Sequence, residues 1–379
     1  MRLRSVVMLG TVISVLLFGM AVGFYVFTRL DMTAYNREVN LYSLVPSDCS
    51  GVLESDNINA FLDNSQMQNY NHELKGFQFP GLFEFLLGEL NEYSSENAHG
   101  LSSQMSRMVV SFHSPMDQVV YFRMGTADEQ LLADMLQEYA PGNFLPKEEV
   151  YRGKSIYVYP LSNEEFLAAY TEKGVFVVSF QKRLIEKVID ARLDNTSLSN
   201  DEVFSKLIGK KKEQNFLTLY AREAPMPFLN MGPDCWSEYN FYMNSDVVYL
   251  TGDTFIPADS QYIEEARERF HEVEIIKEDS LIISSDKDST ALYMEQAMEP
   301  DEMKSYALFD ECVANLSRDA LFSLVTDMQK VVDVPQEFRP YLPPFIINNA
   351  SLFRSFILSV QLSLNADRSS HIWVFTYKY

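Results

Sequence analysis

The sequence opens with a long apolar stretch that no charged side chain interrupts. Residues 6–27 form this stretch, with Arg2 and Arg4 before it and Arg29 after it. As an α-helix rising about 1.5 Å per residue, it reaches roughly 33 Å and covers a hydrocarbon core of about 30 Å. It is longer than the apolar region of a cleaved secretory signal, and it does not end in small residues. The pattern therefore favours an uncleaved transmembrane helix over a cleaved signal.

The flanks of this stretch predict where the rest of the chain lies. Basic residues near its two ends show a slight positive-inside bias, and a short N-terminal tail before a large acidic segment fits export. We expect residues 1–30 to be a membrane anchor with the N-terminus in the cytoplasm, and residues 31–44 to be a polar tether. Residues 31–379 are then periplasmic or extracytoplasmic. No second apolar stretch approaches the length of a membrane span, so a single crossing of the inner membrane is predicted.

Beyond the tether, the spacing of apolar residues alternates between two periods. Apolar residues at every second position, with turn residues between the runs, predict β-hairpins at residues 108–125, 149–161, 241–255 and 356–378. Apolar residues at helical spacing predict amphipathic helices at residues 128–139 and 181–193.

The same order of elements occurs twice along the chain. Residues 172–190 align without a gap with residues 278–296, and both read as a strand followed by a helix. We expect an α+β fold in which repeated, mainly antiparallel sheet-plus-helix units follow the N-terminal transmembrane helix. Its first half covers residues 45–212, and its second half covers residues 213–379 and ends in a partial third copy. Because the copies share few identical residues, chance strand–helix matches stay an alternative interpretation.

Four short segments carry a resemblance to known proteins. They read LVPSDCSGVL from Leu44, YRGKSI at 151–156, GVFVVSF at 174–180 and SLSNDEVF at 197–204. Behind an N-terminal anchor, this combination resembles a class of bacterial membrane-anchored envelope proteins of unknown function. The resemblance implies an exported, repeated α+β architecture and supplies no catalytic residues.

Charge and composition restrict the partners that the protein can bind. Acidic residues number 53 against 31 basic ones, which gives a net charge of −22 over 379 residues, of which 47% are hydrophobic. Such a chain can bury a large core, and its field repels a polyanion, so we expect no nucleic acid partner. The partners predicted are the membrane, through residues 6–27, and an unidentified envelope protein.

The catalytic and metal-binding patterns that we tested do not fit the sequence. No two of the five histidines stand four residues apart, as the zinc motif requires; they are His72, His99, His113, His271 and His371. The Gly-Lys-Ser at 153–155 lacks the first glycine of a phosphate-binding loop. Ser179 and Lys182 have acyl-serine spacing without the companion motifs, and the segment from Asp286 lacks the glycine of a calcium loop. We assign no catalytic, cofactor-binding or metal-ligating residue and expect no cofactor.

The three cysteines are Cys49, Cys235 and Cys312, and an odd number cannot pair fully within one chain. A Cys235–Cys312 disulfide and three buried thiols are both open at this stage. No Cys-x-x-Cys is present, so neither a zinc knuckle nor a thioredoxin-like site is indicated.

Three functions are compatible with these patterns. The leading hypothesis is a non-catalytic interaction or scaffold protein of the cell envelope, because an anchor precedes repeated units and no catalytic template fits. The second is a module that binds a small molecule or lipid between the halves, suggested by 27 Phe and 21 Tyr. The third is a hydrolase, which requires a cleft that brings a histidine to an acid and a hydroxyl group.

The last strand, from His371 to Tyr379, has aromatic residues at alternate positions. This pattern favours packing of the aromatic face in the core, and the alternative is an aromatic face that binds a partner.

Overall fold

The computed structural model describes a large part of the chain beyond its N-terminal region. The described residues are 40–55, 108–114, 117–123, 145–160, 166–172, 174–208, 217–229, 231–232, 234–255, 261–278, 280–298, 307–348, 350–365 and 368–378. Within these ranges no helix is long and apolar enough to span a membrane. The predicted span at residues 6–27 lies outside them, as does the predicted helix at 128–139.

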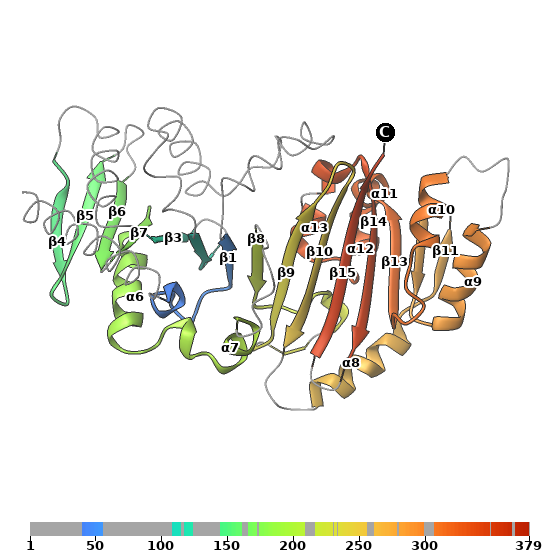
Figure 1. Cartoon of the computed structure of the whole chain (residues 1–379), viewed down its shortest axis with the longest axis horizontal. Helices are drawn as coiled ribbons and strands as arrows, with labels where there is room; N and C mark the ends of the chain where they lie inside the picture. Colours follow the sequence, from blue (N-terminus) through green and yellow to red (C-terminus); the bar gives the residue numbers. More distant parts are fainter. Residues whose placement is uncertain are drawn as a thin grey trace, which may run out of the picture.

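One antiparallel β-sheet of fifteen strands dominates the described residues (Figure 1). Its order is β11-β12-β13-β14-β15-β10-β9-β8-β1-β2-β3-β7-β6-β5-β4, so that β11 and β4 form its two edges. The strands are β1 (Gly51–Ser55), β2 (Met108–Phe112), β3 (Gln118–Arg123), β4 (Lys147–Tyr151), β5 (Lys154–Pro160), β6 (Phe166–Glu172), β7 (Val175–Ser179), β8 (Leu217–Ala221), β9 (Trp236–Met243), β10 (Val247–Phe255), β11 (Ile276–Glu278), β12 (Leu281–Ser284), β13 (Phe322–Asp327), β14 (Phe356–Leu364) and β15 (Arg368–Tyr377).

Short helices cover parts of both faces of this sheet. The α-helices are α6 (Lys182–Leu193), α7 (Glu202–Ile208), α8 (Gln261–Glu272), α9 (Lys287–Met298), α10 (Ala307–Ala314), α11 (Met328–Asp333), α12 (Pro335–Phe338) and α13 (Pro344–Asn348). Single 3₁₀ turns occur at η1 (Leu41–Ser43), η3 (Leu198–Asn200), η4 (Pro227–Leu229) and η5 (Ala350–Phe353).

This arrangement corrects the fold class predicted from the sequence. The prediction of an α+β fold built from repeated, mainly antiparallel sheet-plus-helix units is wrong: the described residues form mainly one large antiparallel sheet with few helices. The units merge because their edge strands pair with each other, β1 with β8 and β10 with β15. An unpaired edge leaves backbone N–H and C=O groups without partners, so joining the edges is favoured over several small sheets.

Three strand-plus-hairpin segments nevertheless occupy equivalent places in the sheet. The hairpins predicted at 108–125, 241–255 and 356–378 are confirmed as the β2–β3, β9–β10 and β14–β15 pairs. Each follows a single strand that is also its neighbour, β1, β8 or β13, and so completes a three-stranded meander. The two segments aligned by sequence differ in their surroundings, because β12 pairs directly with β13, whereas β3, β2 and β1 separate β7 from β8.

The two faces of the sheet carry different helices. Directly paired residues of antiparallel strands point to the same face, so the registers assign each side chain to one face. One face, here called the α6 face, packs against α6 and α7 near β1–β10 and against α9 and α10 near β12–β14. The opposite face, here called the α8 face, packs against α8, α11, α12 and α13 over the strands from β8 to β15.

Helix α6 shows how the sequence pattern produces this packing. Leu184, Ile185, Val188 and Ile189 recur at helical spacing and are all buried, which confirms the helix predicted at 181–193. They pack with sheet residues that include Val119 and others of β2, β3 and β7. Burying each such side chain contributes about 1.5–3 kcal/mol.

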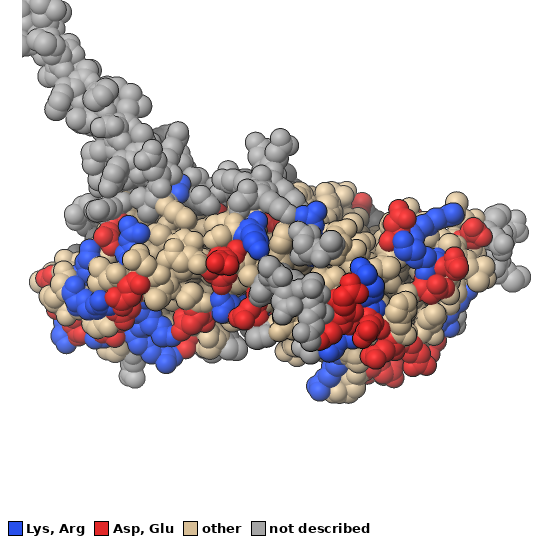
Figure 2. Space-filling model, turned by 90° about the horizontal axis from the view of Figure 1, so that it is seen from below, with Lys and Arg blue, Asp and Glu red and all other residues tan. Residues whose placement is uncertain are grey.

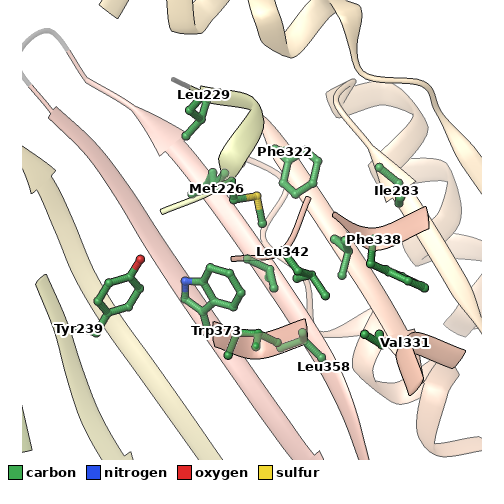
Figure 3. Close-up of a cluster of buried hydrophobic side chains, with 14 of the residues drawn as sticks. Met226, Leu229, Tyr239, Ile283, Phe322, Val331, Phe338, Leu342, Leu358 and Trp373 are labelled. Carbon is green, nitrogen blue, oxygen red and sulfur yellow. The ribbon is translucent and has the colours of Figure 1, made fainter. Parts of the chain in front are cut away.

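The α8 face holds a large aromatic and aliphatic core (Figure 3). Trp373 of β15 lies in it beside Leu358 of β14, and Phe338 and Leu342 close it from the segment after α11. His371, Trp373 and Phe375 are all buried on this face, so core packing of the aromatic alternation in the last strand is confirmed.

Residues 40–44, which the sequence assigns to the polar tether, contribute to the folded part. Leu41, Tyr42 and Leu44 are buried, and Tyr42 packs edge-on against Phe204 with ring centroids 5.0 Å apart. The boundary predicted between the halves, at residue 212, lies outside the described residues, and the division into halves stays a prediction.

Candidate functional site

The three described histidines lie in different parts of the fold, and His72 and His99 lie outside the described residues. His271 is on α8. His371 is buried in β15, where its Nε2 lies 2.9 Å from the carbonyl oxygen of Glu238. His113 follows β2 directly and has both an acid and a hydroxyl group beside it.

The His113 cluster consists of five side chains from four segments of the chain. Asp48 comes from the turn before β1, Ser111 and His113 from β2 and its end, Tyr121 from β3, and Lys187 from α6. Ser111 and His113 are two residues apart on an extended segment and therefore share the α6 face. That spacing is a signal present in the sequence, whereas the approach of Asp48 and Lys187 is not.

Short polar contacts connect the members of the His113 cluster. His113 Nε2 lies 3.1 Å from Ser111 Oγ, which lies 3.2 Å from the Tyr121 hydroxyl. On its other side, His113 Nδ1 lies 3.6 Å from Asp48 Oδ1 and has no hydrogen-bond partner. Lys187 Nζ donates to the second oxygen of Asp48 at 2.6 Å.

Burial sets the protonation of this cluster. Burial lowers the pKa of His113 below its ordinary value, and the positive charges of Lys187 and Arg183 lower it further, against the raising effect of Asp48 and Asp117. For Asp48, partial burial raises the pKa, but the hydrogen bond and charge of Lys187 outweigh it and hold the pKa below its ordinary value. At neutral pH the cluster therefore combines a neutral imidazole with an ionised carboxylate.

The order Asp48–His113–Ser111 resembles a catalytic triad, but its geometry does not suit acyl transfer. The nucleophile of a triad must reach a substrate carbonyl carbon. Ser111 is 0% exposed, and its hydroxyl already contacts Tyr121. The 3.6 Å separation of His113 from Asp48 also exceeds a hydrogen bond. The hydrolase hypothesis gains no support from this cluster, which acts as a structural network.

The other motifs considered in the sequence lie in structural roles. Arg152 and Gly153 both have positive φ, 47° and 79°, in the two-residue turn between β4 and β5, so the Gly-Lys-Ser does not open a helix. Ser179 is buried and donates to the carbonyl oxygen of Gln118 at 2.6 Å. Asp286 accepts from the backbone N–H of Ser289 at 2.8 Å, at the start of α9.

The three cysteines are free and buried, so a Cys235–Cys312 disulfide is not present. Burial raises the pKa of both the Cys49 and the Cys235 thiol to about 12. Among the described residues, no group of three or more His, Cys, Asp or Glu is placed to hold a metal ion.

One part of the α6 face has no described helix over it. This part lies on β10 and β15, in the second half of the sheet. It is called the β10–β15 surface here and consists of three directly paired couples: Val247 with Thr376, Tyr249 with Val374, and Thr251 with Ile372. Figure 1 shows β10 and β15 between α7 on one side and α10 on the other.

Aliphatic, aromatic and hydroxyl side chains form the β10–β15 surface. Ile372 is 46% exposed although it lies on an inner strand, and the other five residues are half-buried. The Tyr249 ring stacks on Tyr242 of β9, with centroids 4.8 Å apart and planes 9° apart. On the side of α10, Cys312 Sγ lies 3.6 Å from Thr376 Oγ1 and marks the border.

An acid lies at each end of this surface. Asp253 of β10 accepts from Ser370 Oγ at 2.7 Å and lies 3.8 Å from Arg368 at one end. Asp246 lies in the β9–β10 turn at the other end. Sequence patterning indicates that Ile372 points away from the aromatic core, but not whether a helix covers it there.

The chain matches no family model and no curated protein. Two solved structures of TP0453 are similar to it in shape, both at 10% sequence identity. Crystal form IV has a TM-score of 0.35 and covers 59% of this chain and 83% of its own. Crystal form I has a TM-score of 0.33 and covers 64% of this chain and 89% of its own.

At these TM-scores neither likeness carries an argument about this chain. The resemblance of the sequence to bacterial membrane-anchored envelope proteins therefore stays at the level of residue pattern. What the protein does has to be inferred from its own surfaces.

Proposed function

We propose that this protein is a non-catalytic interaction or scaffold protein of the cell envelope, and that it holds a protein partner on the β10–β15 surface. The observation that supports this most is the 46% exposure of Ile372 on an inner strand of a fifteen-stranded sheet. Ile372 is the exposed member of the six residues of this surface, and exposed apolar side chains that lie next to other apolar groups are a common feature of interaction sites.

The neighbours of Ile372 make this surface suitable for a protein partner. Val374 and Val247 add aliphatic area, while Thr251, Thr376 and the hydroxyl of Tyr249 offer hydrogen bonds. Interfaces between proteins combine an apolar centre with such polar groups, and tyrosine is enriched in them. The core on the opposite face, built on Trp373 and Phe375, keeps the surface rigid.

Charge favours a partner with basic residues around an apolar centre. The chain carries a net charge of −22, and the border helix α10 has an exposed Glu311 next to Cys312. Figure 2 shows Asp and Glu gathered around the part of the molecule that carries α8, on the opposite face of the sheet, whereas Lys and Arg are more frequent at the end that carries α6. Complementary charge speeds association and excludes acidic competitors.

The location in the envelope comes from the sequence. Attachment to the inner membrane through residues 6–27, with residues 31–379 on the periplasmic or extracytoplasmic side, stays a prediction that the described residues do not address.

The alternative of a ligand held between two halves has less support. Backbone pairing of β1 with β8 joins the two parts of the sheet directly. At this junction Val52, Tyr220 and Trp236 are buried in one core with α6 and α7. A module that binds a small molecule or lipid between its halves requires a cleft where this packing lies.

Site-specific photocrosslinking in native membranes tests the proposed function. A photoreactive residue replaces Ile372 in one variant and Leu292 in the control, because Leu292 on α9 is similarly exposed at 51%. We expect a discrete protein adduct from position 372 and none of the same mass from position 292. Equal adducts at both positions, or none at 372, would contradict the proposal.

A charge substitution gives a second, independent measurement. Ile372→Glu places an acid in the middle of the β10–β15 surface and should reduce capture of the crosslinked partner at least about tenfold, which corresponds to about 1.4 kcal/mol. Leu292→Glu should leave capture unchanged. Circular dichroism on both variants separates loss of binding from loss of fold.

A further inference from the structure

His113 connects three elements that are distant in the sequence. It is 5% exposed and lies between the turn that carries Asp48, the β2–β3 hairpin, and α6 with Lys187. The contact between His113 Nε2 and Ser111 Oγ can form in either protonation state, whereas Nδ1, which carries a proton in the imidazolium, is buried without a hydrogen-bond partner. The elements therefore meet at a titratable ring that is buried in its neutral form.

The charged side chains that face His113 already form ion pairs with each other when its ring is neutral. Asp48 is paired with Lys187, and Asp117 in the β2–β3 turn is paired with Arg183 of α6. These four are the charged groups that act on the ring from the elements packed against it. The ring itself is shielded from water, although Asp48 and Lys187 beside it are 58% and 49% exposed. A proton on His113 therefore adds a positive charge to a largely buried ring, which is costly.

Asp48 does not easily compensate for that charge. Its Oδ1 lies 3.6 Å from His113 Nδ1, beyond hydrogen-bond distance, and its Oδ2 accepts from Lys187. With Asp48 in this position, an imidazolium has no acceptor for its Nδ1–H within hydrogen-bond distance. In this arrangement the contact is therefore less favourable after protonation.

We propose that the His113 cluster is an acid-sensitive latch: when His113 takes up a proton, the segment of residues 45–50 that carries Asp48 opens and the Cys49 thiol becomes accessible. The ring then reaches solvent, where its charge is hydrated. This device is independent of the β10–β15 surface and goes beyond the proposed function.

Opening requires the segment of residues 45–50 to break hydrogen bonds on two sides. Toward the chain after α6, Leu198 N donates to Val45 O at 2.7 Å and Ser47 N to Thr196 O at 3.1 Å. Toward the sheet, Ser50 N donates to Phe112 O at 2.8 Å, and Arg222 donates to the carbonyl oxygens of Ser50 and Ser47 at 2.9 and 2.6 Å. Cys49 is 0% exposed and lies next to Asp48 in the sequence, so its thiol reports on this segment. Cys235 and Cys312 are also buried and free, and they serve as internal references in the second half of the sheet.

The experiment measures thiol labelling of the full chain with 4,4′-dithiodipyridine at pH 7.5 and pH 5.5. Mass spectrometry of the digest gives the labelling rate of Cys49 relative to Cys235 and Cys312. This ratio cancels the effect of pH on the reagent and on thiols in general. One linked proton changes an equilibrium by at most about tenfold per pH unit, and we expect the ratio to rise about fivefold on acidification.

Two variants make the outcome specific to His113. His113→Gln keeps a polar side chain without a titration near neutral pH, and its ratio should not change with pH. Lys187→Gln removes a positive charge that lowers the pKa of the buried ring, so its rise on acidification should be smaller than in wild type. A wild-type ratio that stays constant or falls on acidification, or a rise that persists in folded His113→Gln, would overturn the latch. Should His113→Gln fail to fold, a rise in Lys187→Gln as large as in wild type would overturn it as well.

Discussion

Gly252 lies where β9 and β10 approach so closely that no side chain fits between them. A Cβ atom at this position would lie 1.7 Å from the carbonyl oxygen of Glu238 and 3.1 Å from His371 Nε2. The same carbonyl oxygen lies 2.9 Å from His371 Nε2. The missing side chain at Gly252 therefore allows a buried histidine to contact the backbone of the strand two positions away in the sheet.

Replacing Gly252 tests this close approach. We expect Gly252→Ala to reduce the free energy of unfolding by about 3 kcal/mol, because a backbone carbonyl rather than a flexible side chain must move. The matched control is Gly153→Ala in the β4–β5 turn, where a Cβ meets nothing within 4 Å and only the positive φ of 79° is unfavourable. The control should cost about 1 kcal/mol, measured by denaturant titration, and equal losses would contradict the explanation.

At the same scale, the buried His113 makes the free energy of unfolding depend on pH. The pKa of His113 in the folded state lies below its ordinary value of 6.5 because burial disfavours the charged ring. The unfolded chain then binds more protons below that pH, so the free energy of unfolding falls as the pH drops through and below 6.5. In His113→Gln this part of the fall should be absent from urea titrations at pH 7.5, 6.5 and 5.5. A slope identical to wild type would show that other groups cause it.

At the scale of elements, Asp201 connects a helix start to the sheet. Its Oδ1 accepts from the backbone N–H groups of Val203 and Phe204 at 3.0 and 2.9 Å, at the first turn of α7. Its Oδ2 lies 3.2 Å from a guanidinium nitrogen of Arg222 after β8, and 3.4 Å from Trp236 Nε1 of β9. One carboxylate therefore positions α7 over the junction where β8 and β9 meet.

Removing this carboxylate should cost more than removing a simple helix cap. We expect Asp201→Ala to lower the free energy of unfolding by about 2 kcal/mol, because the cap and the buried partners are lost together. Asp286→Ala is the control, since the Asp286 carboxylate accepts from the backbone N–H and the hydroxyl of Ser289 at the first turn of α9. It should cost about 1 kcal/mol. Equal costs in thermal or denaturant unfolding would show that the Arg222 and Trp236 contacts add nothing.

Elements were predictable from the sequence where their pattern is local. The apolar alternation around Ser114 and the spacing of Leu184 and Val188 each report on residues that are near in the chain, and the hairpin and helix they predict are present. The strand order was not predictable, because the pairing of β1 with β8 depends on residues far apart in the chain. The same holds for the His113 cluster, whose members Asp48 and Lys187 meet only in the folded chain.

At the scale of the whole molecule, both cores include residues from the strands β8, β9 and β10. Tyr220 of β8, Trp236 of β9 and Phe255 of β10 belong to the core that α6 and α7 cover, although all three follow residue 212. The core on the α8 face includes Trp373 and its neighbours instead. Because β8, β9 and β10 contribute to both cores, the two cores are expected to unfold together.

The two tryptophans of the chain report on this coupling, because one lies in each core. Trp236→Phe leaves only Trp373 as a fluorophore, and Trp373→Phe leaves only Trp236. After correction for the stability lost in each variant, we expect both fluorescence transitions in urea to coincide with the circular dichroism transition of the same variant. Separate midpoints for fluorescence and circular dichroism would show two independent folding units.

The position of β15 in the sheet affects how the chain can fold during its synthesis. β15 lies between β14 and β10, and it is the last of the described strands to leave the ribosome. Until residues 368–377 are made, β10 has an unpaired edge, and Trp373 is missing from the core on the α8 face. The second half therefore cannot finish folding step by step as the chain emerges from the ribosome. Nascent chains halted before β15 should be sensitive to protease and prone to aggregate.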